Sequence, residues 1–113
     1  MNIEERIGRA INLIQNGWTK HELARDDKEQ PVSPFAAIAR KWCLIGALAR
    51  ASGIQDYSVD PQHRKVIRIL RHLIGKEMEY VFEWNDHGER TQRDVLILLR
   101  KALVKAKEKA HVS

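Results

Sequence analysis

The stretch from Ser33 to Gly53 is the longest nearly apolar segment of the chain, and it limits the folds that the chain can adopt. Ser33 followed by Pro34 is typical of a helix start, because a serine hydroxyl accepts a hydrogen bond from a free amide and proline has no amide to leave unpaired. Gly53 supplies the left-handed conformation that ends many helices. The sequence therefore predicts a helix of about 18 residues over 33–53, about 27 Å long at the usual rise.

Apolar residues cover most of the circumference of this predicted helix, which indicates burial on most sides. They are Phe35, Ile38, Ala39, Trp42, Cys43, Leu44, Ile45, Gly46, Leu48 and Ala49. Arg40 and Arg50 interrupt them, and the segment is less apolar than the roughly 20 residues that cross a bilayer. We expect a central core helix whose small residues, such as Gly46, let neighbouring helices approach closely.

A first amphipathic helix is predicted over 3–16. Asn2 with Glu5 three residues later resembles a capping box, and Gly17 follows an apolar stripe with helical spacing. The segment 19–32 contains two short extended pieces around a polar turn, or else one turn of helix. The sequence therefore predicts an irregular region here, with a short two-stranded hairpin as one outcome.

Two more helices are predicted in the second half of the chain. The first begins at Asp60, keeps one apolar face for about 20 residues and is bent at Gly75. The last begins at Thr91, with Asp94 three residues later as its capping partner, and its basic tail from about 105 is expected to fray. The chain is thus expected to be mainly α, with about four helices around the central one.

Length and composition predict a single domain over 1–113. A chain of 113 residues buries enough surface for one core and is short for two. Its 43% hydrophobic and 31% charged residues are typical of a folded protein. Cys43 is the only cysteine, which excludes an internal disulfide and favours a cytoplasmic location. The first residues lack a signal-peptide pattern, so secretion is not expected.

Positive charge is concentrated in one part of the chain. The formal net charge is +5, yet residues 61–76 contain no acid and residues 77–89 contain no lysine or arginine. The basic side chains lie opposite the apolar side of the predicted helix, and they form a basic face of Arg64, Lys65, Arg68, Arg71, His72 and Lys76. Such a face suits the phosphates of a nucleic acid, but it is also typical of a solvated surface whose arginines pair with acids.

A polar segment at the end of the same region is the second candidate site. It comprises Trp84, Asn85, Asp86, His87 and Arg90. Polar side chains on a loop beside a tryptophan can present hydrogen-bonding groups to a protein partner or a small ligand. Alternatively, Trp84 packs in the core while Asn85 and Asp86 tie the turn to the next helix. The sequence leaves both interpretations open.

Catalytic and metal chemistry have little support. Cys43 with His87 and Asp86 would suit a thiol-dependent enzyme, but Cys43 lies far from the predicted start of its helix, where the dipole lowers a thiol pKa. The 5 histidines lack the spacing of a metal site, and no phosphate-binding glycine loop is present. The sequence therefore predicts no catalytic residues, no metal site and no cofactor.

Several short motifs together resemble a known family. They are Gly17-Trp18-Thr19, Ala24-Arg25-Asp26, Trp42-Cys43 with Gly46-Ala47-Leu48, and Trp84-Asn85-Asp86 with Arg90-Thr91 and Asp94-Val95. In this order they resemble a family of small uncharacterised bacterial and bacteriophage proteins, over residues 7 to 103 or so. The resemblance implies a compact domain found in bacterial, prophage and phage genomes, and no established activity. One departure is Lys28-Glu29-Gln30, where the family usually has a glycine.

From these observations we rank three possible functions. The first is an intracellular, non-enzymatic binding protein, associated with a phage or prophage, whose partner is a protein or a small ligand. The alternative is a nucleic-acid-binding module that uses the basic face at about 61–80, and a cysteine-dependent enzyme comes last. No membrane association is expected, and a homodimer stays open because small helical domains often bury leftover apolar surface in this way.

Overall fold

The computed structural model describes residues 2–76 and 80–112, with side chains in the last helix up to Lys109. The mainly α fold is confirmed, with a two-stranded antiparallel sheet after the first helix. In chain order the elements are helix α1 (Ile3–Asn16), strand β1 (Ala24–Arg25), strand β2 (Lys41–Trp42), helix α2 (Leu44–Ser52), the 3-10 turn η1 (Tyr57–Val59), helix α3 (Pro61–Ile74), helix α4 (Val81–Asp86) and helix α5 (Gln92–Val112).

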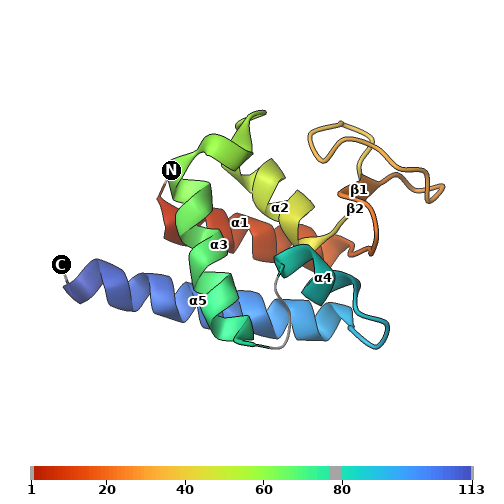
Figure 1. Cartoon of the computed structure of the whole chain (residues 1–113). Coiled ribbons are helices and arrows are strands. Elements are labelled where there is room, and N and C mark those ends of the chain that lie inside the picture. The colour runs from red at the N-terminus through yellow and green to blue at the C-terminus, as the bar shows by residue number, and fades with distance from the viewer. Residues whose placement is uncertain (1, 77–79, 113) are drawn as a thin grey trace.

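Helix α1 lies between α2 on one side and the long helix α5 on the other, and α3 packs across α1 and α5 (Figure 1). The sheet and its loops project at one end of the molecule (Figure 1). Large side chains from four helices fill the space between them, each with at most 2% of its surface exposed: Ile7, Ile14, Leu44, Leu48, Val66, Leu70, Val95 and Leu99. The core is therefore built as much around α1 as around α2.

The predicted helix over 33–53 is wrong in its first half. Residues 34–42 form turns and strand β2, and Trp42 of that strand pairs with Ala24 of β1. The chain folds back on itself here, because the Trp42 indole donates a hydrogen bond to the Pro34 carbonyl (3.1 Å) and the Arg50 guanidinium donates another (3.0 Å). These tertiary bonds outweigh the helical propensity of the segment.

Helix α2 therefore begins at Leu44, with Cys43 as its N-cap. The Cys43 sulfur accepts a hydrogen bond from the Gly46 amide (3.2 Å), and Gly53 ends the helix in the predicted left-handed conformation (φ 69°). A Cβ on Gly46 would lie 1.9 Å from the Leu23 carbonyl oxygen. Close approach at this small residue is thus confirmed, but the neighbour is a loop backbone rather than another helix.

The expected short antiparallel sheet after α1 is present, but its second strand is Lys41–Trp42 instead of a piece of 19–32, where Arg25 and Pro31 form an isolated bridge. Asp26 organises the polar turn, since its carboxylate accepts hydrogen bonds from the amides of Lys28 and Gln30 (both 2.9 Å). Arg25 of β1 bridges to Pro31 across this turn and pairs with Lys41 of β2. The turn therefore closes without the glycine that the resemblance led us to expect.

The predicted helix beginning at Asp60 is two helices. Asp60 caps α3 as expected, but Gly75 ends that helix (φ 70°) instead of bending it. Helix α4 then begins at Val81, and the intervening residues 77–79 lie outside the described residues. Glycine tolerates a positive φ at no steric cost, so an end at this position is favoured over a bend.

The ends of the first and last helices agree with the sequence. The Asn2 side chain accepts a hydrogen bond from the Glu5 amide (2.8 Å), and Thr91 and Asp94 bond to each other's amides (3.2 and 3.0 Å) as a capping box. Helix α5 continues to Val112, past the point from which fraying was expected, because no glycine or proline interrupts it. Within the described ranges no helix is long and apolar enough to cross a membrane.

Candidate functional site

The basic face lies on the outer side of α3. The inner side of this helix buries His63, Val66, Ile69, Leu70 and Ile74 against the rest of the protein. On the opposite side all the members of the basic face are exposed, as the helical period requires. The predicted two-sided character of this helix is thus present along α3, and Lys76 continues the basic face beyond its end.

The basic face surrounds a hollow of about 830 Å³. Its wall includes Ile67 and Gly75, and Arg64 is anchored at one end because its guanidinium donates a hydrogen bond to the Ser58 carbonyl (3.2 Å). The remaining basic residues that line the hollow are Arg68, Arg71, His72 and Lys76. An open basin with several guanidinium groups around it suits a ligand with more than one negative charge.

No described acid forms an ion pair with the basic face. The ion pairs within residues 2–76 and 80–109 are Arg6–Asp60, His21–Asp86, Lys41–Glu29 and Lys105–Glu108. Asp60, the acid at the start of α3, is bound by Arg6, whose hydrogen bond lowers the pKa of that carboxyl group. Within the described residues the cations therefore remain available to an external anion.

His63 closes the inner wall of the hollow and is buried, with 6% of its surface exposed. The ring of Tyr57 packs against it edge-on, with 5.0 Å between the ring centroids. Burial lowers the pKa of His63, so the imidazole is neutral at pH 7. The side of the hollow that His63 forms is thus uncharged, while the residues around the rim are basic.

The second candidate site is a junction rather than an open loop. Asn85 lies within helix α4 and has no exposed surface. Its side-chain oxygen accepts hydrogen bonds from the Trp18 indole (2.8 Å) and the Leu44 amide (3.0 Å), and its side-chain nitrogen donates to the Thr19 carbonyl (3.2 Å) and the Asp86 carboxylate (3.0 Å). Asn85 therefore joins α4 to the chain after α1 and to the start of α2.

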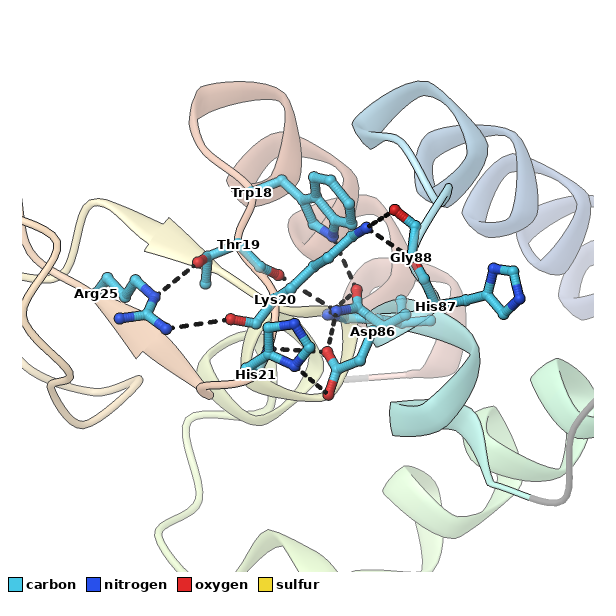
Figure 2. A network of polar contacts seen from close by, with 10 residues as sticks. Trp18, Thr19, Lys20, His21, Arg25, Asp86, His87 and Gly88 are labelled. Carbon is cyan, nitrogen blue, oxygen red and sulfur yellow. Dashed lines mark hydrogen bonds and ion pairs between the residues drawn. The ribbon is translucent and has the colours of Figure 1, made fainter.

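The neighbours of Asn85 extend this junction (Figure 2). Asp86 accepts a hydrogen bond from the His21 amide (2.9 Å), and the Lys20 ammonium donates to the carbonyls of His87 (2.7 Å) and Gly88 (3.0 Å). The imidazole of His87 points away from the network into solvent (Figure 2). Most polar groups of the segment are thus bonded within the protein.

Arg90 completes the segment by covering Trp84. Its guanidinium lies 3.8 Å from the centre of the Trp84 ring and donates a hydrogen bond to the Trp84 carbonyl (2.8 Å). Trp84 itself is buried in the core. The alternative in which this segment fastens the turn to the core agrees with these contacts. Sequence reasoning missed Trp18 and Thr19 as members of the junction, although both belong to the motifs that carried the resemblance.

Cys43 occupies a different environment from the one expected. It caps α2 instead of lying inside a helix, yet burial raises its thiol pKa to about 11, because desolvation outweighs the hydrogen bonds from the backbone amides. The thiol is therefore neutral at pH 7 and a poor nucleophile. No hydrogen bond links it to His87 within the described residues, and no cluster there could hold a metal ion.

The fold and the site define a small, mainly α domain with a basic helix face that pairs with no acid among residues 2–76 and 80–109. The chain belongs to the Family of unknown function (DUF6197), which matches residues 3–104. The match confirms the expected membership of a family of unknown function over nearly the whole chain. No curated protein and no solved structure matches the chain.

Proposed function

We propose that the protein is a non-enzymatic nucleic-acid-binding module whose contact surface is the basic face of α3. The observation that carries this proposal is the set of exposed cations, unpaired with any described acid, around one hollow. Lysine and arginine that neutralise phosphates release condensed counterions, which supplies most of the affinity of a basic surface for nucleic acid. The neutral thiol of Cys43 supports a role without covalent catalysis.

The charge pattern of α3 favours this function over a merely solvated surface. Arg64 and Arg68 are four residues apart and Arg68 and Arg71 three, so like charges face each other along the helix. Such pairs destabilise a helix by about 0.2–0.5 kcal/mol each. An anionic ligand with regularly spaced charges removes this repulsion.

The segment 84–90 supports a small-ligand function less well. Its amide and carboxylate groups are bonded to residues 18–21 and to Leu44, so a ligand would have to displace internal hydrogen bonds. We therefore rank nucleic acid above a small ligand. The proposal includes a cytoplasmic, phage- or prophage-associated setting, in which nucleic acid is accessible and the cysteine stays reduced.

The test is a binding titration of fluorescently labelled DNA by the full chain, read by anisotropy. Replacing Arg64, Arg68 and Arg71 with glutamate is expected to abolish binding at moderate salt, because it reverses the sign of the surface. The matched control makes the same charge change at Arg9, Lys28 and Arg93. These control residues are exposed and line neither hollow on α3.

Equal loss in both triple variants would show that only net charge matters and would contradict a site on α3. Binding by the wild type should weaken steeply with salt, and the slope of log affinity against log salt should fall in the α3 variant. Circular dichroism melts of all three proteins establish that each is folded.

A protein partner is the second candidate, and one observation favours it. Tyr80 and Phe82 are about half exposed (49% and 52%) and stack on each other, with 5.4 Å between ring centroids. Exposed aromatic residues are enriched where proteins bind one another. A second copy of the chain is one such partner. Light scattering of the wild type and of the Tyr80→Ala, Phe82→Ala variant tests the dimer, which the variant should abolish.

A further inference from the structure

Helix α3 separates two hollows, and both contain basic residues. The second hollow, of about 400 Å³, lies between α3, the start of α1 and the last turns of α5. Its lining includes Glu4 of α1, Lys65 and Arg68 of α3, and Ala106 and Lys109 of α5. The basic surface thus continues beyond α3 onto α5.

The positions of three basic residues show that α3 is a ridge between these hollows. Arg64 lines the first hollow and Lys65 the second, and neighbouring residues point about 100° apart around a helix. Arg68 lines both hollows, so it lies on the crest. Helix α3 is therefore a ridge of basic residues with one of the two hollows on each side.

We propose that the nucleic acid is duplex DNA, with α3 in the major groove and one phosphate backbone in each hollow. This inference rests on the proposed function. The major groove of B-DNA is about 12 Å wide and an α-helix with side chains measures about 10–12 Å across, so the groove admits the ridge. The two backbones that border the groove then face Arg64, Arg71 and Lys76 on one flank and Lys65 and Lys109 on the other.

Single strands fit this surface less well. Proteins that hold single strands combine a basic groove with aromatic rings on which bases stack. Neither hollow is lined by phenylalanine, tyrosine or tryptophan among the described residues. The exposed rings of Tyr80 and Phe82 stack on each other instead, next to the exposed acid Glu83.

Duplex RNA is also disfavoured by the ridge. The major groove of an A-form helix is deep and narrow, and its minor groove is wide and shallow. Helix α3 has basic residues on both sides and Arg68 between them, so it suits a major groove wide enough to admit a helix. The narrow major groove of an A-form duplex does not admit one. The geometry therefore points to B-form DNA.

The experiment compares a short labelled DNA duplex, one of its strands and the RNA duplex of the same sequence, each titrated with the full chain. We expect the DNA duplex to bind about tenfold tighter than the other two, or more, which is about 1.4 kcal/mol. Methyl green, which occupies the major groove, should compete, whereas netropsin, which occupies the minor groove, should not. Equal affinity for the single strand, or competition by netropsin alone, would overturn the inference.

Paired variants test the two flanks separately. Arg64→Glu with Arg71→Glu alters the first hollow, and Lys65→Glu with Lys109→Glu alters the second; both pairs should weaken duplex binding more than Arg9→Glu with Lys28→Glu. An unchanged affinity in the Lys65, Lys109 pair would refute the two-backbone arrangement. The variant with alanine at Tyr80 and Phe82 should bind DNA normally.

Glu4 supplies a test of opposite sign, because this acidic residue lines the second hollow. Glu4→Gln should strengthen duplex binding, because it removes a negative charge near the proposed phosphate backbone. Weaker binding would contradict the placement of a phosphate backbone in the second hollow. Failure of every nucleic acid to bind would refute the proposed function itself. Binding of single strands alone would spare that function and refute only the inference about the duplex.

Discussion

Arg6 of α1 donates a hydrogen bond to Asp60, the residue that caps the start of α3, and both side chains are largely buried. This contact attaches the basic helix to the first helix of the fold. The folded-state pKa of Asp60 is lowered, chiefly by the hydrogen bond from Arg6. A lowered pKa means that the charged carboxylate contributes stability above the pKa of the unfolded chain and loses it as the pH falls through the folded value.

Asp60→Asn should therefore lose part of the acid dependence of stability. Asparagine is as good an N-cap as aspartate, so the cap is retained while the charge is removed. Urea unfolding at neutral pH should show the variant less stable than the wild type, and the difference should shrink as the pH falls below about 4. A difference that stays constant over this range would contradict the ion pair as its cause.

Replacing Asn85 with alanine should destabilise the fold strongly. The change leaves the Trp18 indole, the Leu44 amide and the Thr19 carbonyl without their partner. Each buried polar group left unpaired costs about 1–3 kcal/mol, so a loss of several kcal/mol in the free energy of unfolding is expected from denaturant titration.

Trp18→Phe is the comparison for this variant, since it removes one donor and keeps an aromatic ring. It should cost less than Asn85→Ala. A loss of duplex binding by either protein, measured where it is still folded, would indicate that the junction also contacts the ligand.

Gly46→Ala should destabilise the protein by about 1–3 kcal/mol or more, because the added methyl group must displace the Leu23 backbone. Gly8→Ala is the matched control, as Gly8 lies within α1 and a Cβ there meets nothing within 4 Å. That change should stabilise the helix by about 0.5–1 kcal/mol. Thermal melts of the two variants should thus shift in opposite directions, and parallel shifts would refute the close contact at Gly46.

Cys43 should react slowly with iodoacetamide in the folded protein at pH 7. Its pKa of about 11 leaves almost no thiolate, and 5% of its surface is exposed. Mass spectrometry of the alkylated protein over time measures the rate, and unfolding in urea should accelerate it to that of a free thiol. Rapid alkylation of the folded chain would revive the thiol-enzyme hypothesis.

The features predicted well from the sequence depend on residues close together in the chain. The caps at Asn2, Asp60 and Thr91 are hydrogen bonds to amides two or three residues away, so local patterns reveal them. The exposure of the basic face likewise follows from the helical period alone. These are the parts of the fold and of the candidate site that needed no knowledge of tertiary structure.

The features predicted poorly depend on distant partners. Strand β2 replaces the first half of the expected helix because Trp42 pairs with Ala24, and no local pattern shows this pairing. Asn85 is buried because its amide meets Trp18, 67 residues earlier in the chain. The second hollow combines α1, α3 and α5, so Lys109 could not be assigned to the site from its sequence position.

The packing of α1 against α5 affects the nascent chain during synthesis. During synthesis α1 leaves the ribosome before α5, so its apolar stripe is not completely covered until α5 has followed. Ile7 and Ile14, fully buried in the finished protein, remain open to water and to chaperones until then. Truncation within α5 should therefore yield a chain that aggregates or is degraded, however well its earlier segments form helices.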